Sequence, residues 1–204
     1  MTESESPATS VLDTSSPSRN APLSWWSRLA HPVTGDRASL ARLRRARTPL
    51  EALGIRAAME LARRVGAAKS HTPDWRMRAA LDLARVLAHV QEHDPRHPMQ
   101  AAGWKKFAGT RRETEAGEDR PVLSEARFRR LLETGDGEEK VAAFTRLIAL
   151  MSDRINVQRL ADDFLDWNHP TRGDRVREQW AFNYYHAYDA APQAPTTSTE
   201  DDDA

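Results

Sequence analysis

The 204-residue sequence predicts an all-α protein, and three observations lead to that class. Apolar residues recur at helical spacing through most of the chain, and helix-capping residues open several of these stretches. No run of alternating apolar and polar residues indicates a strand, and no Asn-Gly or Asp-Gly hairpin lies between β-branched stretches. We expect about eight or nine helices in two small packed bundles.

The first half of the chain contains the clearest helix starts. A short helix carries Trp25, Trp26 and Leu29, and Asp36 is placed to cap the basic segment that follows. Thr48-Pro49-Leu50-Glu51 combines a capping box with proline at the first helical position. An apolar stripe with a stop at Gly66 follows, formed by Leu50, Leu53, Ala57, Leu61 and Val65. Thr72-Pro73-Asp74 opens the next helix, whose expected inward residues are Trp75, Leu81, Ala84, Leu87 and Val90.

Pro95 and Pro98 break the chain, and further helices follow. A short one is expected over residues 101–107, before a charged loop at 109–120. Ser124 is expected to cap the next helix, and Gly135-Asp136-Gly137 separates that helix from another. Asn156 and Asp174 are placed to cap the last two helices, and the final one carries the i, i+4, i+8 stripe Val176, Trp180 and Tyr184.

The proline break suggests where the two bundles divide. We expect an N-terminal helical bundle with a basic face over residues 22–94 and a C-terminal helical bundle over 95–189. Residues 1–21 are rich in Ser, Thr and Pro, and residues 190–204 are polar and end in acidic residues. Neither segment can bury enough apolar area to offset its ordering entropy, so both are predicted to be disordered. The acidic tail either favours solubility or competes weakly for the basic face.

Composition excludes several classes of protein. The chain has no cysteine, which rules out disulfides and thiolate metal sites and favours the cytoplasm. No apolar run approaches the 18 residues that a membrane span needs. The N-terminus lacks the basic and apolar regions of a signal peptide. These observations indicate a globular protein of the cytoplasm.

Charge is unevenly distributed along the chain, although its formal net charge is zero. Residues 25–89 hold 13 Arg and Lys against 5 Asp and Glu, and five of those arginines fall within residues 37–47. Arginine also outnumbers lysine, 26 to 4. Phosphate contacts by arginine and a genome-wide base-composition bias explain this ratio equally well. Such a bias does not explain the clustering. A phosphate backbone is the commonest partner of a basic face, because each neutralised phosphate releases counterions.

Helical geometry selects the candidate binding residues. With Leu40 and Leu43 buried, a step of 100° per residue turns Arg37, Arg44 and Arg45 towards solvent. With Phe128, Leu131 and Leu132 buried, Arg127 and Arg130 share an open face while Arg129 points elsewhere. Lys105 is a weaker candidate, because Trp104 and Phe107 beside it suit a core as well as a base-stacking site. The alternative for all of these residues is a merely solvated surface.

Catalytic and metal sites find little support. His89, His93 and His97 stand four residues apart, but Pro95 interrupts the helix that would align them. Asp162, Asp163 and Asp166 fit the outer face of an amphipathic helix better than a two-metal centre. No phosphate-binding glycine loop, nucleophile elbow or catalytic triad is evident. We therefore predict no cofactor, no metal and no enzymatic activity.

Several motifs in order resemble the CasB-type small subunit of Cascade, the type I-E CRISPR effector complex. They are the early Trp25-Trp26; Gly35-Asp36-Arg37 leading into the segment 40–46; Leu123-Ser124-Glu125-Ala126-Arg127 with the segment 128–132; Asp163-Phe164-Leu165-Asp166-Trp167-Asn168; and the segment 173–185. The resemblance spans roughly residues 23–188, and the tails depart from it.

The resemblance implies a non-enzymatic helical subunit of an RNA-guided antiviral complex, present as two copies. Its implied partners are the backbone subunits that carry crRNA, the large subunit, and the target and displaced DNA strands of the R-loop. Carried over to this chain, DNA contact falls on Arg37, Arg44, Arg45, Arg127 and Arg130, with Lys105 as a weaker addition. No membrane is implied.

Two rival functions remain open at this stage. A helical, sequence-specific DNA-binding regulator would need base-reading side chains, and the basic segment has no Asn or Gln to read adenine. A purely structural scaffold would use the same arginines to pair with acidic surfaces of partner proteins.

Overall fold

The computed structural model describes residues 20–102 and 121–186, and within them the predicted all-α class is confirmed. These two ranges hold ten helices, slightly more than the eight or nine expected. The predicted tails, most of the helix expected at 101–107 and the loop at 109–120 lie largely or wholly outside the described residues. The helices are α1 (Ala21–Ala30), α2 (Arg37–Arg45), α3 (Pro49–Leu53), α4 (Arg56–Arg64), α5 (Asp74–Leu87), α6 (Pro98–Ala102), α7 (Glu125–Leu132), α8 (Glu138–Leu150), α9 (Val157–Trp167) and α10 (Gly173–His186).

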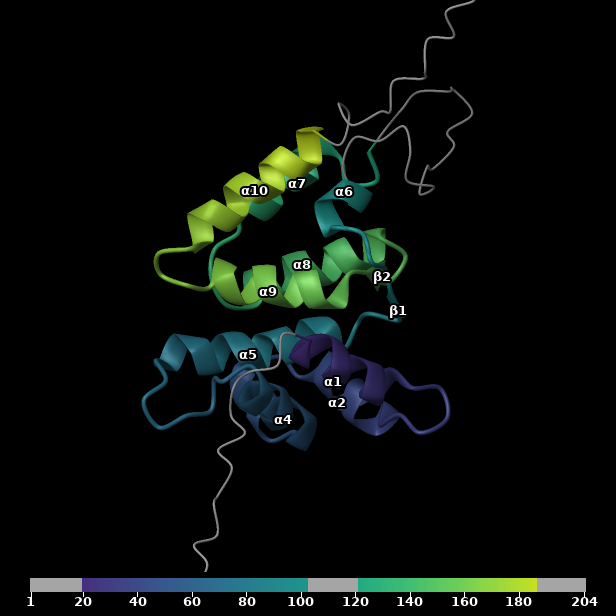
Figure 1. Ribbon diagram of the computed structural model, residues 1–204, viewed down its shortest axis with the longest axis vertical. Coiled ribbons are helices and arrows are strands. Elements are labelled where there is room, and N and C mark those ends of the chain that lie inside the picture. The colour runs from purple at the N-terminus through teal and green to yellow at the C-terminus, as the bar shows by residue number, and fades with distance from the viewer. Residues whose placement is uncertain (1–19, 103–120, 187–204) are drawn as a thin grey trace, which may run out of the picture.

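The helices form two groups stacked along the long axis of the molecule (Figure 1). Helices α1 to α5 form one group, and α6 to α10 form the other. Helix α5 lies where the groups meet, and it packs against α3 and α4 on one side and against α8 and α9 on the other. The division into bundles at residue 95 stays a prediction, because a single buried apolar cluster runs through both groups.

Helix α5 is central because it is buried all round from Ala79 onward. Every residue from Ala79 to Ala88 is buried, which is the pattern of a helix enclosed by others rather than one with a wet face. Two of these buried residues are charged, Asp82 and Arg85. Buried charges need partners, and these two pair with each other; Arg85 also contacts Glu138 of α8 and the carbonyls of Ala46 and Arg47, between α2 and α3.

One short pair of strands departs from a purely helical structure. Strand β1 (Glu92–His93) pairs in parallel with β2 (Arg154–Ile155), and Glu92 lies opposite Arg154. Two residues are too few to produce an alternating pattern, so this pair could not be predicted from the sequence. The pairing ties the segment after α5 to the turn between α8 and α9.

Several predicted helix boundaries are confirmed. Asp36 caps α2 by accepting a hydrogen bond from the Ser39 amide at 2.9 Å, and Asn156 caps α9 by accepting one from the Arg159 amide at 2.9 Å. Gly66 follows the end of α4 with φ of +71°, a left-handed conformation that glycine adopts without strain.

Other expectations for the first half were wrong. Leu50 and Leu53 are 76% and 41% exposed instead of buried, because the helix breaks at Gly54 and Ile55 and the apolar stripe does not continue. Helix α1 begins at Ala21, inside the segment predicted to be disordered.

In the second half, Asp163 is buried rather than on an outer face. Helix α10 begins at Gly173, so Asp174 lies in its first turn instead of capping it. In the described part of the chain, no helix is both long and apolar enough to cross a membrane.

Candidate nucleic-acid interface

Helix α2 presents the first set of predicted arginines. Asp36 caps this helix, because it accepts hydrogen bonds from both the hydroxyl and the amide of Ser39. These two hydrogen bonds lower the pKa of the Asp36 carboxyl. Leu40 and Leu43 are buried as expected, and Arg37, Arg44 and Arg45 are exposed. The helical wheel therefore placed these side chains on the correct side.

The three guanidinium groups rest on neutral acceptors. The Arg37 Nη2 donates to the Pro32 carbonyl at 2.8 Å, the Arg44 Nε to the Ala88 carbonyl at 2.7 Å, and the Arg45 Nε to the Ala41 carbonyl at 3.0 Å. Backbone carbonyls orient a guanidinium without cancelling its charge. None of the three makes an ion pair with a carboxylate in residues 20–102 or 121–186.

The charge on α2 also acts on a neighbouring histidine. His89 has a lowered pKa, first because it is partly buried and second because the positive charge of Arg44 disfavours its protonation. A positive potential therefore surrounds the end of α2.

Helix α7 presents the second set. Arg127 and Arg130 are exposed while Phe128 and Leu131 are buried, as the wheel predicted. Arg129 points elsewhere and lies 3.6 Å from the Glu125 carboxylate. Arg127 and Arg130 form no ion pair within the described ranges, and both line a groove of about 870 Å³ between α7 and α8.

A buried arginine of α5 connects the end of α2 with the start of α8. Arg85 of α5 donates from Nη1 to Asp82 at 2.8 Å and to Glu138 at 2.7 Å. It also donates from Nε to the Ala46 carbonyl at 3.0 Å and from Nη2 to the Arg47 carbonyl at 2.7 Å. The side chain of Arg85 thus binds both the end of α2 and the start of α8.

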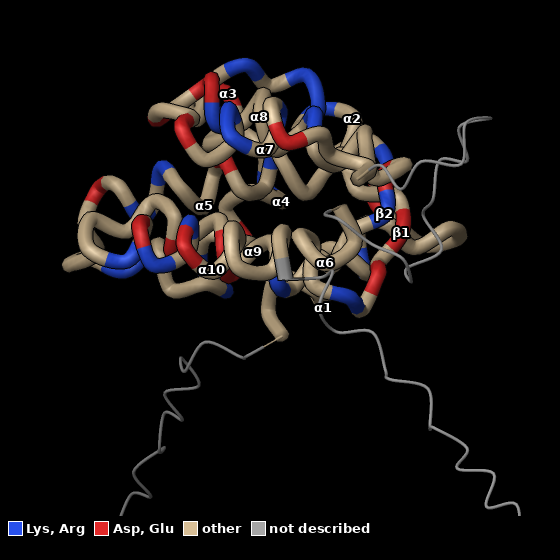
Figure 2. Tube along the Cα trace, turned by 90° about the horizontal axis from the view of Figure 1, so that it is seen from above, with Lys and Arg blue, Asp and Glu red and all other residues tan. Residues whose placement is uncertain are grey.

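The two sets lie on the same side of the molecule. In the view from above, α2, α3, α7 and α8 lie on one side, and α1, α6, α9 and α10 lie on the other (Figure 2). Helices α2 and α7 belong to different groups along the long axis (Figure 1). Both sets of arginines therefore lie on helices of one side, with acidic residues interspersed between them.

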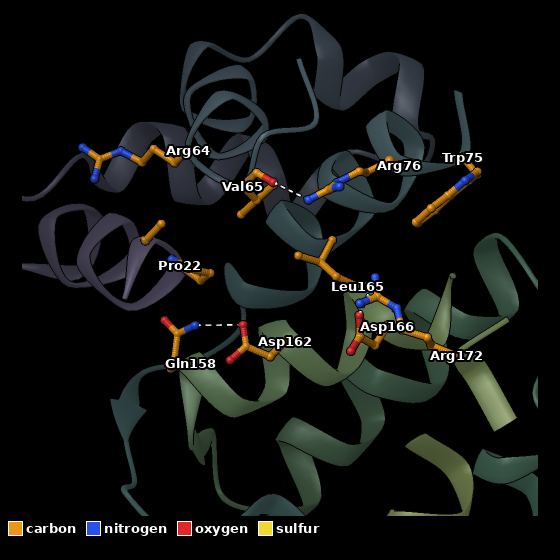
Figure 3. A pocket seen from close by; sticks show the side chains of 11 residues that line it. Pro22, Arg64, Val65, Trp75, Arg76, Gln158, Asp162, Leu165, Asp166 and Arg172 are labelled. Atoms are coloured by element: carbon orange, nitrogen blue, oxygen red, sulfur yellow. Dashed lines mark hydrogen bonds and ion pairs between the residues drawn. The ribbon is translucent and has the colours of Figure 1, made fainter. Parts of the chain in front are cut away.

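A second cleft, between the two groups of helices, is less suited to nucleic acid (Figure 3). Two of its three arginines are paired with carboxylates: Arg172 lies 3.0 Å from Asp166, and Arg64 lies 2.9 Å from Glu60. The exposed carboxylate of Asp162 also lines this cleft and would repel phosphate.

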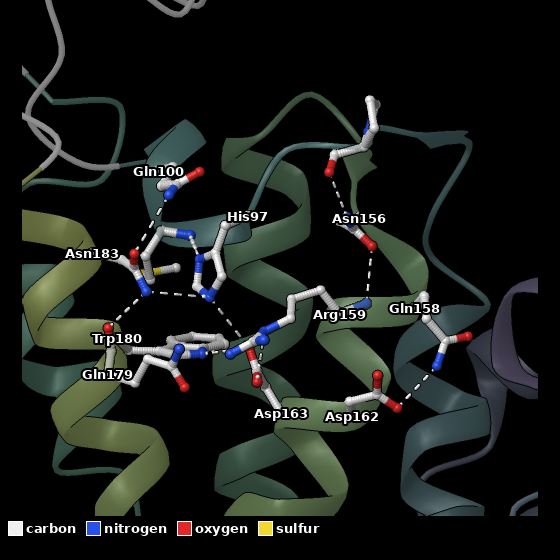
Figure 4. Close-up of polar contacts among 12 residues, drawn as sticks. His97, Gln100, Asn156, Gln158, Arg159, Asp162, Asp163, Gln179, Trp180 and Asn183 are labelled. Carbon is white, nitrogen blue, oxygen red and sulfur yellow. Dashed lines mark hydrogen bonds and ion pairs between the residues drawn. The ribbon is translucent and has the colours of Figure 1, made fainter. Parts of the chain in front are cut away.

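His97 and His93 take structural roles, and Figure 4 shows the contacts of His97. His97 accepts a hydrogen bond from the Met99 amide at 3.1 Å through Nδ1, and His93 accepts one from the Val157 amide at 3.2 Å. Burial lowers the pKa of His97 to about 4, and the nearby charge of Arg159 adds to the effect. Within the residues that the structure describes, no three His, Asp or Glu side chains could hold a metal ion.

Sequence reasoning missed the exposed Arg146 and the buried Arg85. Arg146 is exposed and lines the groove with Arg127 and Arg130, yet it stands alone in its segment of sequence. The role of Arg85 depends on Glu138, which is distant in the chain. Lys105, the weaker candidate, lies outside the described residues.

Fold and surface together define an all-helical protein with exposed arginines on one side. The sequence profile described as CRISPR-associated protein Cse2 matches residues 37–185, which is most of the chain, and the chain belongs to this family. Among solved structures, the chain is similar to the crystal structure of CasB from Thermus thermophilus. The two share 25% sequence identity with a TM-score of 0.55, over 82% of this chain and 97% of that chain. No curated protein matches the sequence significantly.

Family membership sets the biological context. A CasB-type protein of the Cse2 family is a subunit of the CRISPR effector complex Cascade, alongside other Cas subunits.

Proposed function

We propose that this chain is the non-catalytic small subunit of an RNA-guided DNA surveillance complex and that it stabilises the R-loop in antiviral defence. It does so by sequence-independent binding of the target or displaced DNA strand. The observation that carries this proposal is the exposure of Arg37, Arg44, Arg45, Arg127 and Arg130, none of which is paired with a carboxylate of the described residues.

The proposed role needs electrostatics and no catalytic group. Exchanging a DNA duplex for an RNA–DNA hybrid is nearly balanced in free energy, as in the Cas9-type case, so modest contacts can shift it. Arginine suits this task because its planar guanidinium forms bidentate contacts with phosphate and remains charged. A cationic surface that holds a strand slows reannealing without reading its sequence.

The proposed partners follow from the family and the surface. They are the backbone subunits with their crRNA, the large subunit, a second copy of this chain and the two DNA strands. The cytoplasm is the proposed compartment, where crRNA and invading DNA meet.

The test is the lifetime of the R-loop formed by the assembled complex. Replacing Arg37, Arg44, Arg45, Arg127 and Arg130 with alanine should shorten it about tenfold or more, since several charged contacts are lost together. A matched control replaces five exposed arginines elsewhere, namely Arg63, Arg78, Arg154, Arg172 and Arg175. An unchanged lifetime, with the subunit still incorporated, would refute the proposal. Loss of incorporation only in the first variant would favour the scaffold function.

A further inference from the structure

The groove between α7 and α8 has a chemistry that phosphate binding alone does not need. Its floor is aliphatic, and its exposed edge carries three arginines; the lining comprises Leu123, Leu131, Ala143, Leu147, Ala149 and Leu150 with Arg127, Arg130 and Arg146. Its volume of about 870 Å³ lies in the range of sites that receive whole ligands. A surface that only attracted phosphate would need no apolar recess beside its arginines.

Charge is segregated along this groove. Glu133 and Glu139, which also line it, flank the short connection between α7 and α8. Arg127 and Arg146 lie about two turns away from that connection, and Arg130 lies one turn away. The groove is therefore cationic at one end, and the carboxylates would repel a phosphate at the other.

From this geometry we infer that the groove receives unpaired bases of a single DNA strand while its arginines hold the adjacent phosphates. The inference rests on the proposed function and specifies its ligand as unpaired DNA. A duplex keeps its base faces stacked, so only an unpaired strand offers apolar faces and phosphates together. The displaced strand of an R-loop is such a strand.

An acidic protein segment is the competing occupant, and the groove favours it less. Two glutamates at one end would repel an acidic partner there. The same carboxylates can accept hydrogen bonds from exocyclic amino groups of bases, as glutamate does with cytosine N4. A nucleic-acid strand can therefore contact both ends of the groove, with its phosphates at the arginines and the amino groups of its bases at the carboxylates.

The test compares two bubble targets bound by the assembled complex. In one the displaced strand carries bases, and in the other it is an abasic phosphodiester. The base-bearing strand is non-complementary to the target, so reannealing contributes to neither lifetime. The complex should dissociate about fivefold more slowly from the base-bearing target, because only that strand can bury the apolar face of a base against the aliphatic floor.

Two variants remove the apolar recess and keep its arginines. Ala143→Gln makes the aliphatic floor of the groove polar without adding an aromatic face, and Leu150→Gln makes its half-buried edge polar. Each should bring the ratio of the two lifetimes to about one. Ala142→Gln and Leu165→Gln are the matched controls, because both positions are half-buried and neither lines the groove. Urea denaturation of all four variants identifies any that fails to fold.

The possible outcomes are distinct. Equal lifetimes on both targets in the unsubstituted complex would overturn the inference, and so would an unchanged ratio in the folded groove variants. If Ala143→Gln instead prevented incorporation of the subunit while Ala142→Gln did not, the groove would hold a protein, and the inference would again be wrong. The proposed function would fail separately, if the five-alanine variant changed neither lifetime.

Discussion

The face of α2 and the groove between α7 and α8 carry the same side chain in different settings. On α2 the arginines lie against backbone carbonyls, as Arg44 does on Ala88. On α7, Arg127 and Arg130 edge an apolar recess. The first setting suits phosphate alone, while the second also suits a base. Under the proposed function, one molecule holds a strand at two places by different physical means.

The largest expected effect comes from breaking the link between the two regions. Arg85→Met leaves the buried carboxylate of Asp82 without its partner, which should lower the free energy of unfolding by about 3–5 kcal/mol. Arg78 lies on the same helix but is exposed, so Arg78→Met should change the free energy of unfolding by less than about 0.5 kcal/mol. Urea denaturation measures both, and equal stabilities would show that Arg85 does not hold the regions together.

A second substitution should damage the α2 face alone. A Cβ at Gly35 would clash with the backbone carbonyls of Leu29 and His31, so Gly35→Ala should destabilise the protein by about 3 kcal/mol and displace the start of α2. Gly54→Ala meets only an ordinary contact with the Glu51 carbonyl at 3.6 Å and serves as the control. If amide hydrogen exchange in α2 were the same in both variants, this account of the turn would be wrong.

Acid should destabilise the protein at a site outside both regions. The folded pKa of His97, about 4, lies below the ordinary value of 6.5, so the unfolded chain binds more protons between these pH values. The stabilisation that comes from keeping His97 neutral is fully present above pH 6.5. It decreases as the pH drops, so the free energy of unfolding should be lower by about 2 kcal/mol at pH 5.

His97→Asn supplies the comparison for that prediction. Asparagine can still accept the hydrogen bond of the Met99 amide but does not titrate. Urea denaturation at pH 7 and pH 5 should show a smaller loss in this variant. The same loss in both proteins would exclude His97 as its source.

The smallest effect is expected beside the α2 face. Leu50 is 76% exposed, so Leu50→Gln should change the free energy of unfolding by no more than about 0.5 kcal/mol. Leu43→Ala, at a fully buried position of α2, should cost about 2–5 kcal/mol. A large loss for Leu50→Gln in thermal or urea unfolding would mean that the apolar stripe predicted from sequence is buried after all.

Local signals accounted for most of what the sequence predicted correctly. Capping by Asp36 and the burial of Leu40 and Leu43 fix the orientation of α2, and with it the exposure of Arg37, Arg44 and Arg45. The helical wheel failed at Leu50, because a helix break at Gly54 ended the stripe.

Features that depend on distant parts of the chain could not be predicted in this way. Arg85 finds Glu138 on another helix, and the exposure of Arg146 depends on what covers α8. The parallel pair β1–β2 joins segments about sixty residues apart through only two residues each. Such long-range contacts leave no periodic trace in a single sequence.

The salt dependence of DNA binding by the assembled complex tests the central claim most directly. If each of the five arginines meets one phosphate of a single strand, the slope of log affinity against log salt should become shallower by about 3.5 in the five-alanine variant. The three α2 substitutions alone should account for about 2 of this change. A slope equal to that of the unsubstituted complex, or an equal change in the matched control, would contradict the account.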